Sequence, residues 1–153
     1  MTSKREQILA AVFTVLKATE PAALRNAALA IVESGEVVTL RDGEIELTEE
    51  FFNGESGSIY EFTATPKVII LIALADDPPD GVPADLDGQL DVRCTAIAAA
   101  LNTSFAAGAL ALLATGLRVQ PADTEPREIF GAEHLKGAEV PIEIDYWSDK
   151  SSG

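Results

Sequence analysis

The chain offers few residues that could carry out nucleophilic catalysis, because it contains one histidine and one cysteine. His134 lies in the polar segment FGAEHLKG, which supplies no evident nucleophile for an imidazole to activate. We therefore expect a surface or interface histidine. Cys94 falls on the apolar stripe of a predicted helix, where a free cysteine behaves as a small hydrophobe. We interpret it as a core residue.

Carboxylates are abundant, but their spacing does not form a metal or acid/base site. Asp76, Asp77 and Asp80 resemble part of a calcium loop, yet the EF-hand spacing and its final glutamate are absent. General acid/base chemistry needs a desolvated pair with separated pKa values, whereas doublets such as Glu49-Glu50 belong to a uniformly acidic segment. No G-x-S-x-G, Walker or G-x-G-x-x-G motif is present. The sequence predicts no metal, no cofactor and no enzymatic activity.

The most marked feature of the composition is an acidic third. Residues 42–92 contain thirteen Asp and Glu residues and one base, Lys67, within a chain of net charge −14. Such a surface repels phosphate and forgoes the counterion release that drives nucleic-acid binding. We expect no sequence-specific nucleic-acid binding.

Length and hydropathy indicate one domain. The 153 residues, 47% of them hydrophobic, can bury a core without disulfides or metal. We predict one domain over 1–147 and a mobile tail over 148–153. The longest apolar run, Val68–Ala75, is far shorter than the roughly 20 residues of a membrane-spanning helix. With no visible signal peptide, we expect synthesis in the cytoplasm and no membrane contact.

Two segments have helical periodicity. Residues 3–18 form an amphipathic pattern in which Ser3 is the N-cap and Glu6 completes a capping box. A longer helix is predicted from 86 onward, broken near 102–104, with a second helical piece up to Gly116. Residues 22–33 fit a helix and an extended segment equally well. The stripe of the longer helix comprises Leu86, Leu90, Cys94, Ile97, Leu101 and Phe105.

Several segments alternate as strands do. Residues 37–41 and 44–47 flank Asp42-Gly43, a tight-turn dipeptide, so this part predicts a local hairpin. Pro66 cannot donate to a ladder, so it should mark a bulge, an edge or a turn. The element order predicts an α+β fold with a mixed or antiparallel sheet and helices packed on one face. Further strands are predicted at 59–65, 68–75, 117–120 and 140–147.

Three aromatic residues stand in charged surroundings. Phe51-Phe52 follows Glu49-Glu50, and Trp147 lies on the polar side of its strand. Apolar residues in such positions are either core plugs or anchors of a protein contact, since interface hot spots place an aromatic inside a charged rim.

Three segments together carry a family resemblance: the opening KREQILAAVFTVL, the strand and turn VVTLRDGEIEL, and the closing VPIEIDYWSD. With the long strand that leads into a helix, they resemble tail terminator (tail completion) proteins of long-tailed phages and phage-derived gene transfer agents. The resemblance implies an α+β sandwich and a structural role without a cofactor. Members of that family form a hexameric ring that caps the tail tube, stops its polymerisation and joins it to the head connector. Its implied location is the tail or neck of a virion or phage-like particle.

A ring subunit needs two complementary faces, and isolated arginines such as Arg93, Arg118 and Arg127 could pair with a neighbour's acids. The acids could also line the lumen, where they would keep passing DNA from lodging; equally, they could lie on the outer rim and serve solubility. The residues expected near oligomer or partner contacts are Arg41, Asp42, Phe51, Phe52 and Trp147. The possible lumen acids are Glu44, Glu46, Glu49, Glu50, Asp76, Asp77 and Asp80.

Three alternatives remain from sequence. A head-closure or neck protein of the same particle would share composition and ring symmetry. An acidic interaction domain that mimics DNA would bind a basic partner instead of tube ends. A small acid-rich enzyme is disfavoured by the single histidine and single cysteine.

Overall fold

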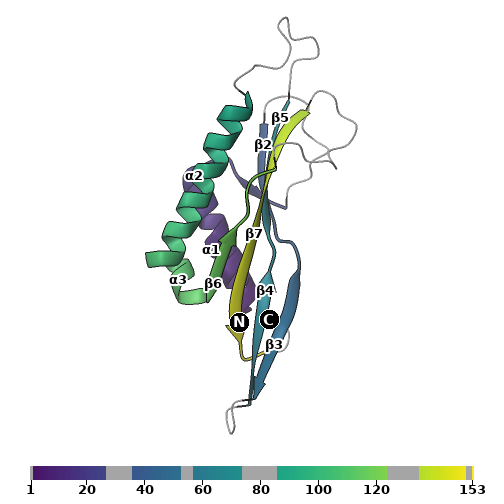
Figure 1. Ribbon diagram of the computed structural model, residues 1–153, viewed down its shortest axis with the longest axis vertical. Helices are drawn as coiled ribbons and strands as arrows, with labels where there is room; N and C mark the ends of the chain where they lie inside the picture. Colours follow the sequence, from purple (N-terminus) through teal and green to yellow (C-terminus); the bar gives the residue numbers. More distant parts are fainter. Residues whose placement is uncertain (1, 27–35, 53–56, 74–85, 124–134, 151–152) are drawn as a thin grey trace, which may run out of the picture.

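The computed structural model describes residues 2–26, 36–52, 57–73, 86–123, 135–150 and 153. In these residues three helices pack against one side of a seven-stranded, mostly antiparallel open sheet, which confirms the predicted α+β fold (Figure 1). The elements are α1 (Lys4–Thr19), β1 (Leu24–Arg25), β2 (Glu36–Arg41), β3 (Ile45–Phe52), β4 (Ser58–Ala64), β5 (Lys67–Ala73), α2 (Leu86–Ala107), α3 (Ala109–Leu113), β6 (Gly116–Val119) and β7 (Leu135–Ser148).

Helix α1 begins where the sequence predicts. The Ser3 side chain accepts a hydrogen bond from the Glu6 backbone N–H (N···Oγ 3.1 Å), which satisfies one of the free amides of the first turn. The capping box is only half formed, because the Glu6 carboxylate binds Arg25 instead of the cap residue. The buried stripe of α1 consists of Ile8, Leu9, Val12 and Leu16.

Helix α2 is longer than predicted. Leu90, Cys94, Ile97 and Leu101 are buried as the spacing indicates. The expected break at 102–104 is wrong, because Thr103 donates its hydroxyl to the Ala99 carbonyl (2.9 Å) and stays within the helix. The chain leaves α2 at Gly108, where a Cβ would lie 3.1 Å from the backbone of Ser104.

Strands β2 and β3 do not pair with each other, so the predicted local hairpin is wrong. β2 pairs with β5 and β3 pairs with β4, both antiparallel. Residues 36–52 and 58–73 thus form one long two-stranded ribbon, whose strands are joined through 53–57. Asp42-Gly43 lies in the middle of one of its strands and not at its end.

The ribbon bends where residues 42–44 face Thr65-Pro66. Three residues oppose two there, since Arg41 pairs with Lys67 and Ile45 pairs with Ala64. This is a bulge, so the expectation that Pro66 marks an irregularity is confirmed. Gly43 has φ +69°, and a Cβ on it would lie 2.0 Å from the Thr65 carbonyl oxygen. Only glycine fits this bend without distortion.

Strand β7 is the longest strand described, with 14 residues instead of the eight predicted over 140–147. Its first half pairs with β5, and its second half pairs with β4 on one edge and β6 on the other. The predicted alternation is confirmed: Ile142, Ile144 and Tyr146 are buried beneath the helices, while Trp147 is exposed on the opposite side.

Two further segments of the sequence analysis are residues 22–33 and the predicted tail 148–153. Of the described residues of 22–33, Ala22 lies in a turn, and Leu24–Arg25 form a short strand that pairs with β2 in parallel. The predicted tail starts with Ser148, the last residue of β7, and its Gly153 is buried beside Tyr146. Asp76, Asp77, Asp80, Arg127 and His134 lie outside the described residues.

Candidate protein-interaction surface

The side of the sheet that faces away from the helices carries an exposed aromatic pair. Phe51 of β3 and Trp147 of β7 are 40% and 50% exposed, and their ring centroids are 6.1 Å apart. Trp147 Nε1 donates a hydrogen bond to Glu61 Oε2 of the intervening strand β4 (3.1 Å). The structure therefore brings together two of the five predicted contact residues and holds the indole through one hydrogen bond and one ring contact.

A second bulge directs Phe51 to this side. The register shifts between Leu47 and Glu49, so Leu47 pairs with the buried Phe62, whereas Glu49 pairs with Glu61. Strict alternation would have kept Phe51 on the same side as Leu47. The Thr48 hydroxyl donates to the Glu61 carbonyl oxygen (3.0 Å) at the bulge. Bulges commonly re-aim side chains in this way.

Acidic side chains surround the aromatic pair. By register, Glu46 and Glu49 of β3 lie on the same side of the sheet as Glu61, whereas Glu50 pairs with Tyr60 on the helix side. Glu44, Glu46, Glu49 and Glu50 are all exposed. Glu44 lies in the bend, and the other three are divided between the two sides of the edge strand β3. The predicted lumen acids that the structure describes therefore do not form one uniform face.

Arg118 of β6 completes this surface. Its guanidinium binds Glu143 Oε2 (Nε 2.9 Å) and Asp145 Oδ2 (Nη1 2.9 Å). Asp145 also accepts a hydrogen bond from Thr63 Oγ1 at 2.7 Å. Burial by itself would raise the pKa of Asp145, but these hydrogen bonds outweigh burial and hold the pKa below its usual range. Arg118 thus pairs with two acids of its own chain.

We call this surface the acidic-aromatic face. It is formed by one end of β3, β4, β6 and β7 on the side opposite the helices. Its residues are Glu46, Glu49, Phe51, Glu61, Arg118, Glu143, Asp145 and Trp147.

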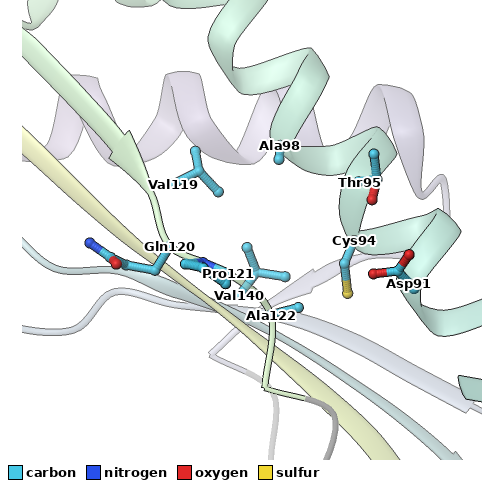
Figure 2. Close-up of a pocket in the computed structure, with 9 residues that line it drawn as sticks. All are labelled: Asp91, Cys94, Thr95, Ala98, Val119, Gln120, Pro121, Ala122 and Val140. Carbon is cyan, nitrogen blue, oxygen red and sulfur yellow. The ribbon is translucent and has the colours of Figure 1, made fainter.

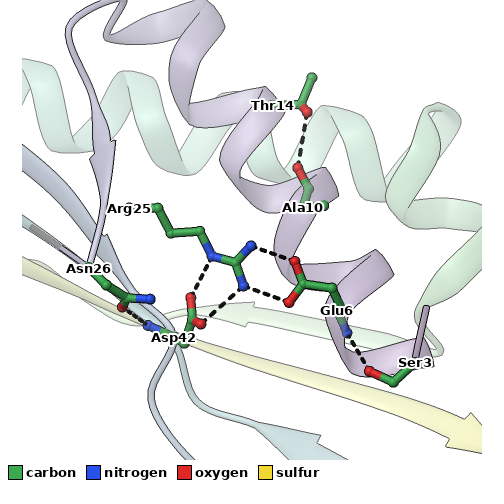
Figure 3. Close-up of polar contacts among 7 residues, drawn as sticks. All are labelled: Ser3, Glu6, Ala10, Thr14, Arg25, Asn26 and Asp42. Carbon is green, nitrogen blue, oxygen red and sulfur yellow. Dashed lines mark hydrogen bonds and ion pairs between the residues drawn. The ribbon is translucent and has the colours of Figure 1, made fainter. Parts of the chain in front are cut away.

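Asp42, another predicted contact residue, is held inside its own subunit. Arg25 Nε and Nη2 bind the Asp42 carboxylate at 2.8 and 3.0 Å, while Nη1 and Nη2 bind Glu6 at 2.6 and 2.8 Å (Figure 3). The hydrogen bonds from Arg25 hold the pKa of Glu6 and of Asp42 below their ordinary values. Asn26 Oδ1 accepts from the Asp42 backbone N–H (3.1 Å). This clamp ties α1 to the bend of the sheet.

Arg93 forms a similar clamp. It binds Glu20 at the end of α1 through Nε (2.8 Å) and Glu36 at the start of β2 through Nη1 (2.8 Å). It too has its partners within the chain. Arg41 is half-buried and lies opposite Lys67, beyond the bend from the acidic-aromatic face. Nothing is described of the Phe52 side chain, although its backbone pairs with Ser58.

A shallow pocket of about 350 Å³ lies on the helix side, between α2 and the segment after β6 (Figure 2). Cys94 and Val140 form part of its mainly apolar lining, and Asp91 stands at its edge. Burial raises the pKa of the Cys94 thiol, which disfavours the thiolate. The arrangement agrees with the interpretation of Cys94 as a core residue.

Among the described residues, no group of three or more His, Cys, Asp or Glu is placed to hold a metal ion. In the same part of the chain, no helix is long and apolar enough to cross a membrane. No protein-family model matches the chain, and no curated protein matches it either.

Proposed function

We propose that this chain is a structural tail terminator of a long-tailed phage or a phage-derived gene transfer agent. In this role it forms a ring similar to the hexamers of the family that its sequence resembles. The ring caps the tail tube, stops its polymerisation and offers a surface to the head connector. The proposal starts from the sequence resemblance, whose three segments correspond to α1, to β2 with the start of β3, and to the end of β7.

The acidic-aromatic face is the observation that supports an assembly role best. Exposed aromatics inside a charged rim are the usual anchors of protein contacts, and Phe51 and Trp147 are already in contact in the free subunit. Such an arrangement suits a subunit that binds other proteins. The shallow pocket lacks a comparable set of converging polar groups.

The fold gives a ring subunit stiff elements. β7 spans both halves of the sheet, and the Arg25 and Arg93 clamps tie α1 and α2 to the sheet at β2 and at its bend. A rigid subunit loses little conformational entropy when it enters an assembly. A subunit of net charge −14 associates only through specific contacts, which favours a closed ring over open aggregation.

Size-exclusion chromatography with light scattering, combined with a tube-assembly assay, tests the proposal. We expect a ring oligomer, either alone or on tubes, and tubes whose growth stops when the protein is added to the tail tube protein of its own particle. A chain that stays monomeric and leaves tube growth unchanged would overturn the proposal. A ring that binds the connector but never the tube would indicate a head-closure protein instead.

A further inference from the structure

The acidic-aromatic face is prepared to bind before any partner arrives. Trp147 Nε1 donates to one oxygen of the Glu61 carboxylate (3.1 Å), and the other oxygen lies 3.3 Å from Thr48 Oγ1, whose single hydroxyl proton is shared with the Glu61 carbonyl oxygen (3.0 Å). The Phe51 ring contacts the same indole, with ring centroids 6.1 Å apart. Little side-chain entropy remains to be lost there on binding, so an apolar contact on this pair would be efficient.

The charge of the face limits what can bind. It holds five carboxylates, those of Glu46, Glu49, Glu61, Glu143 and Asp145, against the single guanidinium of Arg118, a formal charge of −4. Arg118 is already shared by two of these carboxylates. The bases Arg41 and Lys67 lie beyond the bend at Pro66, where Lys67 Nζ is 3.5 Å from Glu139.

Two classes of partner are disfavoured by this charge. Nucleic acid would bring phosphates against carboxylates with no counterion release to offset the repulsion. The same face of a second copy would bring like charges together, which costs association free energy and lowers the association rate.

We infer that the acidic-aromatic face docks a different protein, one that presents lysine or arginine side chains around an apolar patch. The apolar patch covers Phe51 and Trp147, and the bases meet Glu46, Glu49 and Glu61. The inference rests on the proposed function only in taking this face to be an assembly contact. Under that function, the partner is a basic surface of the tube end or of the connector.

The strand β3 offers a matched pair of variants for the test. Glu49 and Glu50 are adjacent, both exposed, and lie on opposite sides of the sheet. Glu49→Lys and Glu50→Lys change the net charge equally, so any non-specific attraction of a cation to the chain changes equally. Phe51→Ala and Leu112→Ala form a second pair, since Leu112 is 85% exposed on α3, away from this face.

Trp147 is the only tryptophan of the chain, so its fluorescence reports binding at the face directly. The probe is a synthetic amphipathic peptide of lysine and leucine, with a glutamate-leucine peptide of the same length as the negative control. We expect the cationic peptide to shift the Trp147 emission to shorter wavelength. Its affinity should fall about tenfold in Glu49→Lys and Phe51→Ala but by no more than about twofold in Glu50→Lys and Leu112→Ala.

Equal losses in Glu49→Lys and Glu50→Lys would overturn the inference, because binding would then follow net charge alone. A duplex oligonucleotide that shifts the Trp147 emission would overturn it too, as would a change in oligomer size confined to Glu49→Lys. Repeating the comparison on purified tail tubes separates the two proposals. Tube capping and connector binding that are both equally strong in the two glutamate variants contradict the inference and leave the proposed function standing. Selective peptide binding without any tube capping contradicts only the proposed function.

Discussion

The indole Nε1 of Trp147 and the Oε2 of Glu61 form a 3.1 Å hydrogen bond between β7 and β4, on the side of the sheet away from the helices. Because Glu61 and Trp147 are direct cross-strand partners, the register of the sheet sets this contact. The neighbouring Phe51 reaches the same indole from β3 only because of the bulge beside Thr48. The aromatic pair is therefore a product of the sheet geometry.

Replacing Phe51 by alanine should expose Trp147 further without unfolding the chain. We expect the acrylamide quenching constant of Trp147 to rise and the free energy of unfolding to fall by about 0.5–1 kcal/mol, the usual value of a contact between two aromatic rings. Quenching titrations and urea denaturation measure the two quantities. Unchanged quenching would show that Phe51 does not cover the indole in solution.

Replacing Arg25 by alanine should lower the free energy of unfolding more than Phe51→Ala does. The substitution leaves Glu6 and Asp42 facing each other without their shared guanidinium, so we expect a loss of roughly 1–3 kcal/mol in the free energy of unfolding. Lys17→Ala, at an exposed site of α1, is the control and should change stability by less than about 0.5 kcal/mol. Equal effects of the two substitutions in urea denaturation would contradict the role of Arg25 as a clamp.

The same clamp predicts a pH dependence. The pKa values of Glu6 and Asp42 lie below their ordinary values of 4.5 and 3.8 in the folded chain. A lowered folded-state pKa adds stability that is complete above the unfolded-state pKa and is lost as the pH falls through the folded-state pKa. The stability difference between the wild type and Arg25→Ala should thus be constant from pH 7 to about 5 and shrink below about pH 4. A stability difference that grows as the pH falls would contradict the predicted direction of this pH dependence.

Two glycines should respond to alanine in opposite directions. Gly43→Ala forces a Cβ into the Thr65 carbonyl at a positive φ, so we expect a loss of at least about 2 kcal/mol or failure to fold. Gly88→Ala in α2 meets nothing within 4 Å and should stabilise the chain by up to about 1 kcal/mol. Thermal melts of the two variants check the comparison. A neutral Gly43→Ala would show that the bend is not as tight as described.

Local features were predictable because their causes are local. The Ser3 cap, the stripe of α2 from Leu90 to Leu101 and the alternation of β7 follow from spacing and capping chemistry within a few residues. The end of α2 was misjudged because Thr103 can satisfy its hydroxyl on the preceding turn, an option that propensity does not reveal.

Strand pairing was not predictable in the same way. Asp42-Gly43 is a common hairpin turn, and the sequence contains nothing that favours the alternative in which Gly43 forms a bulge opposite Pro66. The choice depends on β5, a strand that comes later in the chain and whose apolar residues offer β2 a better partner than β3 does. Non-local partners of this kind override a strong turn signal.

The candidate surface was predicted in part. Composition singled out Phe51 and Trp147 as aromatics among acids, but only the bulge after Leu47 brings them to the same side. Asp42 was expected with them near subunit contacts, and its carboxylate is bound by Arg25, a residue that the sequence did not mark. A short polar bulge carries almost no sequence signal, so no alternation rule could have found it.

We propose that this chain terminates a tail tube as a ring. Electron microscopy of tail tubes assembled with the purified, gold-labelled protein tests it most directly. We expect a ring of the labelled chain at one end of each tube and nowhere along its length. Label that is absent from tube ends, or spread evenly along the tubes, would contradict it.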